Sequence, residues 1–136
     1  MKTTSEIIYT GQLRTEIKHT LSGQTFITDA PPDNQGKGEA ISPTDMVATA
    51  LGTCILTTIG IKSQFSDFEI DGATAKVTKH MASDPRRISE IVVELNFPPN
   101  NYSDKTKQII ENTAKHCPVA QSLHPNTKQT LIFNFL

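Results

Sequence analysis

The 136-residue sequence lacks an excess of charge of one sign, because 13 basic and 14 acidic residues leave a formal net charge of −1. It also lacks a basic run, a basic patch interleaved with aromatic residues, and an acidic tail. These absences give no reason to expect a nucleic-acid partner or a solvating segment. The length suffices for a sizeable core, and we expect a single domain over residues 1–136.

Long apolar runs are missing as well. Residues 1–5 are polar, which argues against a signal peptide. The most apolar stretch, residues 46–61, is interrupted by threonines and two glycines, and we expect it to be too short to span a bilayer. The sequence therefore predicts a cytoplasmic protein without a membrane partner.

Cysteine is scarce, and the sequence contains only Cys54 and Cys117. In a reducing compartment two cysteines are more often catalytic, metal-binding or inert than joined in a permanent disulfide. Each could also be a plain core residue, since free cysteine is among the most buried residue types. Both lie on apolar stripes of expected helices, so we expect them to face the same core.

Alternating apolar residues and turn signals predict several β-strands. We expect strands at residues 6–9, 13–19, 24–28, 73–78, 91–97 and 131–135. A hairpin is expected around Asp84–Pro85. Residues 30–39 contain two prolines and two glycines and are expected to form a loop without regular structure.

The strongest helix signal begins at Ser42, which can cap a helix whose first residue is Pro43. Asp45 suits the positive end of the helix dipole. Apolar and small residues then surround the segment as far as Ile61, which predicts a buried central helix carrying Cys54.

A second helix is expected after Ser103, which can cap it, and its apolar stripe ends at Cys117. Pro118 then restarts the chain in a short helical turn. The sum is an α+β domain in which antiparallel sheets pack around the buried central helix.

A catalytic cysteine must react as the thiolate, because the thiol is a poor nucleophile. Cys54 lies too deep in its helix to benefit from the N-terminal dipole, so it requires a nearby cation. A guanidinium at about 4 Å supplies roughly 4 kcal/mol, against about 2.7 kcal/mol needed to lower a pKa by two units. Among the three arginines, Arg86 and Arg87 are expected at a solvated hairpin tip. From its strand position alone Arg14 is expected to be an ordinary surface charge, although it could reach inward if a carboxylate holds it.

Two motifs are recognisable as a pair: SPTDMVATALGTC at residues 42–54 and HCPVAQSL at residues 116–123. Together with segments 9–14 and 36–39, they resemble the OsmC-like branch of the OsmC/Ohr family, named for osmotically inducible protein C and the organic hydroperoxide resistance proteins. The resemblance runs over essentially the whole chain and agrees with the expected order of strands and helices.

The resemblance implies an OsmC-like fold, an intertwined homodimer with active sites at the subunit interface, and thiol-dependent reduction of hydroperoxides, preferably organic ones, in oxidative-stress defence. Cys54 matches the peroxidatic cysteine and Cys117 the resolving cysteine. Their disulfide would be reduced by a dithiol, such as a lipoyl-containing protein. No cofactor and no metal are expected.

The sequence departs from the family pattern at one position. Peroxidase members carry a glutamate ten residues before the reactive cysteine, where this chain has Thr44. Asp45 and Glu39 are the nearest carboxylates. We therefore expect Arg14, Glu39 and Asp45 to complete the catalytic set of the two cysteines.

Two alternatives remain open. Zinc would accept Cys54, Cys117, His116 and His124 as ligand types, although their spacing does not match the usual closed sites. The second alternative is an OsmC-like small-molecule-binding protein without peroxidase activity, and Thr44 in place of the glutamate favours it.

Overall fold

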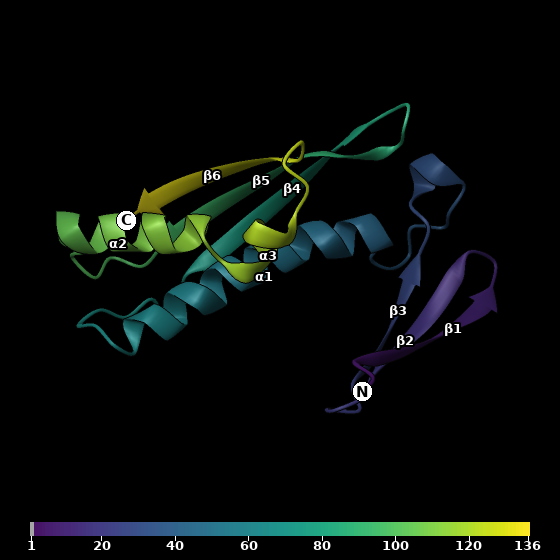
Figure 1. Cartoon of the computed structure of the whole chain (residues 1–136), viewed down its shortest axis with the longest axis horizontal. Coiled ribbons are helices and arrows are strands. Elements are labelled where there is room, and N and C mark those ends of the chain that lie inside the picture. Colours follow the sequence, from purple (N-terminus) through teal and green to yellow (C-terminus); the bar gives the residue numbers. More distant parts are fainter. Residues whose placement is uncertain (1) are drawn as a thin grey trace. The chain divides into compact units, whose positions relative to one another are not determined.

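The computed structural model describes residues 2–136. In this range it contains two three-stranded sheets, three α-helices and one short 3₁₀ helix (Figure 1). The predicted α+β class is confirmed. The chain divides into two compact units, one ending at Met46 and the other formed by Val47–Leu136.

The N-terminal unit contains an antiparallel sheet in the order β1-β2-β3. Its strands are β1 (Ser5–Gly11), β2 (Arg14–His19) and β3 (Thr25–Asp29). After β3, Pro32–Asn34 forms a 3₁₀ helix, so the expectation of a loop without regular structure is wrong at these residues. Proline at the start of this turn has its φ already near the helical value.

Helix α1 (Pro43–Ser63) begins where the sequence predicts. The Asp45 backbone N–H donates to Ser42 Oγ at 3.0 Å, and the Ser42 N–H donates to Asp45 Oδ2 at 3.2 Å. This reciprocal pair is a capping box, which satisfies two backbone donors at the start of the helix. Ser42 is buried, so the start of α1 is fixed firmly.

The second sheet has the order β4-β5-β6, with β4 (Thr74–Ala82), β5 (Arg87–Phe97) and β6 (Lys128–Phe135). β4 and β5 form the predicted antiparallel hairpin, but β5 and β6 are parallel. The prediction of purely antiparallel sheets is therefore wrong. The cause is the connection through α2 (Asp104–Lys115) and α3 (Pro118–Ser122), which returns the chain to the end of the sheet where β5 starts.

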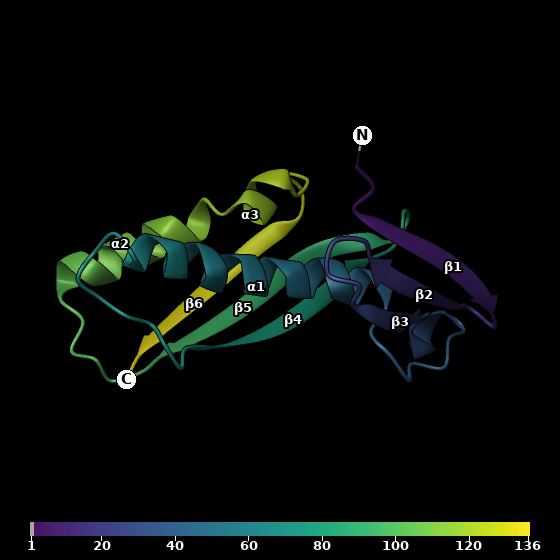
Figure 2. The ribbon, with the colours of Figure 1, turned by 90° about the horizontal axis from the view of Figure 1, so that it is seen from below.

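Helices α1, α2 and α3 lie on one face of this second sheet, as the two ribbon views show (Figures 1 and 2). Ten side chains at the centre of this layer are fully buried. They are Leu51, Ile55, Ile59, Ile91, Val93, Leu95, Phe97, Ile110, Ala114 and Cys117. A Cβ atom at Gly52 would lie 2.7 Å from the Val77 side chain, so glycine is what lets α1 approach β4.

The expectation that α1 is buried all round is wrong, because the sheet covers only one of its faces. Val47 and Ile61 on α1 are 40% and 54% exposed. Its 21 residues also exceed the expected stretch 46–61, so the expectation of insufficient length is wrong. Within residues 2–136, α1 is the helix that is long and apolar enough, by length and composition alone, to cross a bilayer. Its other face nevertheless belongs to the core.

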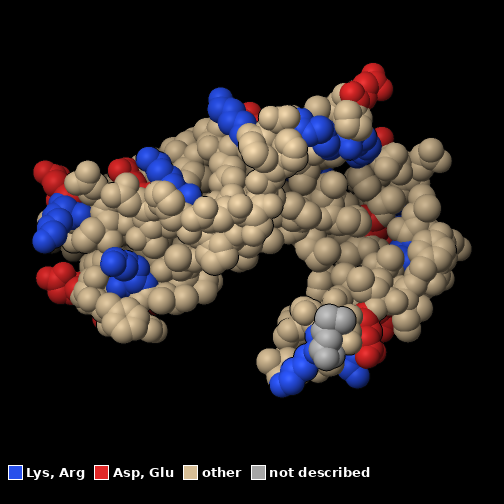
Figure 3. All heavy atoms as spheres, in the orientation of Figure 1, with Lys and Arg blue, Asp and Glu red and all other residues tan. Residues whose placement is uncertain are grey.

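Charged side chains are dispersed among uncharged atoms on the face drawn in Figure 3. No broad basic field is visible on that face, in line with the near-zero net charge.

Candidate functional site

Cys54 lies on the middle of α1 and packs at the margin of the hydrophobic core. Its side chain is half-buried, which leaves part of the residue accessible from outside. One turn further along the helix, Thr58 Oγ1 is 3.8 Å from Cys54 Sγ. A hydroxyl at this position can donate a hydrogen bond to a thiolate without moving the backbone.

Cys117 occupies the N-cap of α3 and is fully buried. The Ala120 N–H donates to Cys117 Sγ at 3.4 Å. Pro118 at the first helical position fixes the turn that presents this sulfur to the core. The chain therefore holds Cys117 in one orientation through both its cap and its packing.

The two cysteines lie near each other in the core, as the sequence predicts from their apolar stripes. Both are free thiols, Cys117 belongs to the buried core cluster, and Cys54 packs against that cluster. Burial raises the pKa of the Cys117 thiol above its ordinary value, and Cys54 raises it further, whereas the N–H groups of Ala120 and Val119 act in the opposite direction. The protonated thiol of Cys117 is therefore favoured.

This arrangement distinguishes the two sulfurs. Cys54 is partly exposed, whereas Cys117 is fully buried. A molecule arriving from solvent meets Cys54 first.

Arg14 begins β2 in the N-terminal unit and is clamped by Asp29 at the end of β3. Arg14 Nε donates to Asp29 Oδ1 at 2.7 Å, and Nη2 donates to Oδ2 at 2.8 Å. Asp29 is only 1% exposed, and its Oδ2 also accepts the Glu39 N–H at 3.2 Å. A bidentate pair with a buried carboxylate fixes the guanidinium plane as well as its position.

The two carboxylates named from the sequence lie at different points of the N-terminal unit. Glu39 lies near the clamp, with its Oε1 3.9 Å from Arg14 Nη2, but its carboxylate is largely exposed. Asp45 accepts the Ser42 N–H in the helix cap. Thr44, at the position of the family glutamate, has its hydroxyl 3.3 Å from Ser42 Oγ. The carboxylate that holds Arg14 is Asp29, which the sequence reasoning missed.

A signal for Asp29 was present in the sequence. The turn after β2 makes this strand pair with β3 in an antiparallel register, and that register puts Arg14 opposite Asp29. Counting outward from a four-residue turn at residues 20–23, whose flanking residues His19 and Gln24 are hydrogen-bonded, pairs Arg14 with Asp29. Opposite charges facing each other across a strand pair stabilise the sheet, which is the physical reason to look there.

The turn before Arg14 is conformationally unusual. Gln12 and Leu13 have φ of 55° and 63°, so two successive non-glycine residues adopt the left-handed region. Two-residue hairpin turns of this geometry match the twist of the strands, but they favour glycine and asparagine. The Leu13 N–H donates to Tyr9 Oη at 3.2 Å, which helps hold the turn. The chain thus maintains a strained turn directly beside Arg14.

Asp29 gives the clamp a predictable pH dependence. The hydrogen bonds from Arg14 hold the pKa of Asp29 below its usual range, despite the opposing effect of burial. A depressed carboxyl pKa contributes stability that is present above the unfolded-state value of about 3.9 and is lost as the pH falls toward the folded-state value. Asp29→Asn should therefore lower the melting temperature at neutral pH and flatten its decline in acid.

Thermal unfolding measured between neutral pH and the acid range checks this expectation. Glu6→Gln removes an exposed carboxylate from β1 and serves as the matched control, which should follow the wild-type curve. An Asp29→Asn curve parallel to that of the wild type down to the lowest pH would show that the clamp does not contribute.

Arg87 also differs from expectation. It was expected at a solvated hairpin tip, but it begins β5 and is half-buried. Its Nη2 is buried and has no hydrogen-bond partner within residues 2–136. The reason is that the turn ends at Arg86, and Arg87 already pairs with Ala82 in the sheet.

The structure does not support the zinc site considered from the sequence. Within residues 2–136, no group of three or more histidine, cysteine, aspartate or glutamate side chains could hold a metal ion. His116 Nδ1 lies 2.7 Å from the Asn112 carbonyl oxygen. His124 Nδ1 accepts the Asn126 N–H at 3.0 Å. Both histidines thus engage the nearby backbone.

Fold and site together define an α+β protein with an asymmetric pair of free thiols, one accessible and one enclosed. Comparison with known proteins agrees with this class. Residues 36–131 match the family model described as OsmC, OsmC-like protein. The chain therefore belongs to the OsmC-like family, as its paired motifs suggested. A search of curated proteins gave no match.

Solved structures give the same fold. A Psychrobacter arcticus protein, provisionally assigned to osmotic stress induction and the detoxification response, is 51% identical with a TM-score of 0.94, covering 98% of this chain and 97% of that chain. An OsmC-like protein from Mycoplasma pneumoniae is 15% identical with a TM-score of 0.82, covering 100% and 98%. An organic hydroperoxide resistance protein from Elizabethkingia anophelis is 16% identical with a TM-score of 0.73, covering 100% and 99%. The last two similarities concern the fold alone.

Proposed function

We propose that this protein is a thiol-dependent hydroperoxide reductase that prefers organic hydroperoxides and acts in oxidative-stress defence. The observation that carries the proposal is the proximity of a partly exposed Cys54 to a fully buried Cys117 in one core. Membership of the OsmC-like family, which includes structures described as organic hydroperoxide resistance proteins, supports it.

The chemistry proceeds in two steps on the cysteine pair. The Cys54 thiolate attacks the terminal peroxide oxygen, the O–O bond breaks, and the alkoxide leaves with a proton as an alcohol. Cys54 is now a sulfenic acid. The Cys117 sulfur then forms a disulfide with Cys54, its proton joins the departing hydroxide, and water is released.

Return to the reduced state requires two electrons from outside the chain. We propose a dithiol reductant, such as a lipoyl-containing protein, because thiol exchange with a dithiol regenerates both sulfurs without a bound cofactor. This cycle needs a reducing compartment and fits the expected cytoplasmic location.

Arg14 is the proposed activator of Cys54. A fixed guanidinium favours the thiolate and the negative charge that develops on the departing alkoxide. The two-point clamp on buried Asp29 supplies the orientation that the family glutamate would give, so Thr44 need not abolish activity. In this proposal Glu39 adds a second carboxylate beside Arg14, and Asp45 fixes the start of the helix that carries Cys54.

We further propose that the working form is a homodimer. The N-terminal unit buries few side chains but exposes several large apolar ones, namely Ile7, Ile8, Tyr9, Leu13, Leu21, Phe26 and Ile27. Helix α1 adds exposed Val47 and Ile61. In each unit, large apolar side chains left exposed support an interaction site. A second copy of the chain is the occupant that the family resemblance implies.

The test is to mix reduced protein with a small excess of cumene hydroperoxide and, separately, hydrogen peroxide, and then to measure free thiols and intact mass. We expect the organic peroxide to remove both thiols of each chain faster than hydrogen peroxide does. A mass loss of two hydrogens and a peptide linking Cys54 to Cys117 should accompany it. Dithiol treatment should restore both thiols.

The alternative function, small-molecule binding without peroxidase activity, makes the opposite prediction. Thiols that survive an excess of cumene hydroperoxide in folded protein would favour it. Thr44 in place of the family glutamate is the feature that supports this alternative.

A further inference from the structure

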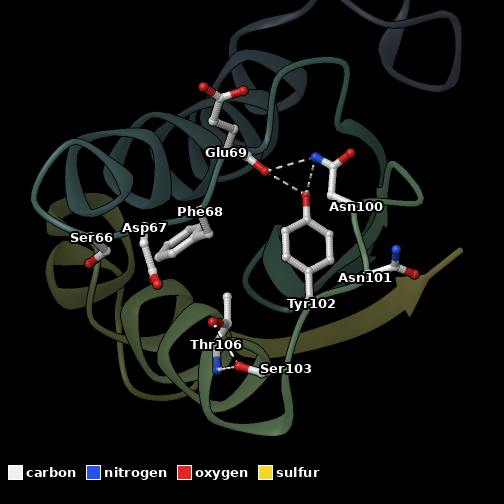
Figure 4. A pocket seen from close by; sticks show the side chains of 9 residues that line it. All are labelled: Ser66, Asp67, Phe68, Glu69, Asn100, Asn101, Tyr102, Ser103 and Thr106. Carbon is white, nitrogen blue, oxygen red and sulfur yellow. Dashed lines mark hydrogen bonds between the residues drawn. The ribbon is translucent and has the colours of Figure 1, made fainter.

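A cavity of about 710 Å³ lies in the unit Val47–Leu136, away from the residues assigned to thiol chemistry. It is formed where the chain leaves α1 and where it enters α2. Its lining is drawn in Figure 4 and consists of Ser66, Asp67, Phe68, Glu69, Asn100, Asn101, Tyr102, Ser103 and Thr106. A cavity of this volume can enclose a small organic molecule.

Two aromatic rings stand on different sides of this cavity. Figure 4 shows the Phe68 ring and the Tyr102 ring separated by open space. Both side chains also pack against the hydrophobic core, which limits their motion. Tyr102 is held further by the Phe135 ring, whose centroid is 5.7 Å away. The ring surfaces facing the cavity are therefore in place before a ligand arrives.

A hydrogen-bond network fixes the polar end of Tyr102. Its hydroxyl donates to the Glu69 carbonyl oxygen at 2.6 Å. Asn100 Nδ2 donates to the same carbonyl oxygen at 3.1 Å and to Tyr102 Oη at 3.2 Å. The Glu69 carbonyl thus gathers two donors, as the dashed lines in Figure 4 show. This network fixes the position of the Tyr102 hydroxyl. Because the phenol O–H already donates to the Glu69 carbonyl oxygen, it is not available to donate to a ligand.

The charges around the cavity favour a cation. Asp67 contributes a carboxylate to the lining, and the nine lining residues include no lysine, arginine or histidine. Burial raises the pKa of Tyr102, and the carboxylates of Asp71 and Glu69 raise it further, against the effect of Asn100. Two carboxylates outside the hydrogen-bond network thus act on the phenol in addition to Asp67 in the lining.

An anion would have to use the N-terminus of α2, which also borders the cavity. The Thr106 N–H there already donates to Ser103 Oγ at 3.1 Å, and the Ser103 hydroxyl donates to Thr106 Oγ1 at 3.0 Å. These caps occupy donors that an anion would need. The cavity is thus better suited to positive charge.

We propose that this cavity binds a small organic cation, of the alkylammonium class, between Phe68 and Tyr102 with its charge balanced by Asp67. Aromatic faces attract ammonium groups through the negative potential of their π-systems, and a carboxylate at the rim adds selectivity for charge. The lining of this cavity contains neither cysteine. Cation binding here can therefore be tested separately from the proposed hydroperoxide reductase activity.

The test is an NMR titration of the reduced full-length protein with choline as the probe. Its neutral carbon analogue, 3,3-dimethyl-1-butanol, has the same shape without the charge and serves as the control ligand. We expect saturable amide shifts for choline in residues 66–69 and 100–106, with a dissociation constant of about 1 mM or weaker, which is usual for a ligand with so few atoms. The alcohol should give shifts that do not saturate over the same range.

Two variants sharpen the result. Asp67→Asn and Phe68→Leu should each weaken choline binding roughly fivefold, the loss expected for one exposed charge pair or one cation–π contact. Asp104→Asn, which removes an exposed carboxylate of α2 outside the lining, should leave choline binding unchanged. Because Asp67 is exposed, its variant folds even if Phe68→Leu does not. Equal binding of choline and the alcohol, shifts elsewhere, or wild-type affinity in Asp67→Asn would overturn the proposal.

Discussion

Cys54→Ser is expected to abolish the reaction with organic hydroperoxide, whereas Cys117→Ser should leave the first step intact. Serine at position 54 removes the partly exposed sulfur of the pair, so the one remaining thiol, Cys117, should survive a small excess of peroxide. With serine at position 117, Cys54 should still be oxidised, but no partner sulfur remains to form the disulfide. The product should be a sulfenic acid that continues to higher oxidation states.

Intact mass spectrometry with a sulfenic-acid trap distinguishes these outcomes. The Cys117→Ser chain should gain one oxygen or one trap adduct, at Cys54, and should not turn over with a dithiol as the wild type does. Thr53→Ser, an exposed neighbour on α1, provides a control that leaves both sulfurs in place. The assignment is reversed if Cys117 is oxidised in the Cys54→Ser protein at the wild-type rate.

Replacing Arg14 is expected to have the second largest effect. Without the guanidinium the thiolate of Cys54 loses its proposed cation, and the rate of peroxide reduction near neutral pH should fall about a hundredfold, the equivalent of two pKa units. Arg14→Lys keeps the charge but cannot form the two-point clamp with Asp29, so its rate should lie between those of the wild type and Arg14→Met. Stopped-flow measurement of thiol oxidation against pH separates a lost thiolate from a lost binding contact.

Stability has to be controlled in this experiment. Arg14→Met alone leaves a buried, unpaired carboxylate at Asp29, which destabilises the fold. The double variant Arg14→Met/Asp29→Asn removes both charges and should fold while remaining slow. Arg87→Met is the matched arginine control, because Arg87 also has a buried guanidinium nitrogen. A large loss of rate in Arg87→Met, with Arg14→Met unaffected, would transfer the activating role to Arg87.

The sequence predicted the helices and most strands correctly because their signals are local. The start of α1 is predicted by three residues within a four-residue segment, Ser42, Pro43 and Asp45. The structure contains the corresponding capping box. The parallel pairing of β5 and β6 was missed because a strand's alternation of apolar residues is the same in either direction. Direction depends on how the intervening helices return the chain, which local patterning does not encode.

The candidate site was predictable in part for the same reason. The proximity of Cys54 and Cys117 follows from two apolar stripes that must share one core. The partner of Arg14 depends on the register between two strands, and a search limited to carboxylates close to the motif favoured Glu39 and Asp45 over Asp29. The half-buried position of Arg87 depends on where the hairpin ends, which a one-residue error in the turn is enough to change.

The placement of Cys117 on the crossover between β5 and β6 has a thermodynamic consequence. A bond from this sulfur to Cys54 on α1 would close a loop of about sixty residues that contains all of β4, β5 and α2. In the chain-entropy description, such a closure restricts the unfolded ensemble by about 4 kcal/mol. The disulfide form would therefore unfold at a higher temperature than the dithiol form. Each turnover would alternate the molecule between these two stabilities, and the unfolding temperature would report the oxidation state of the pair.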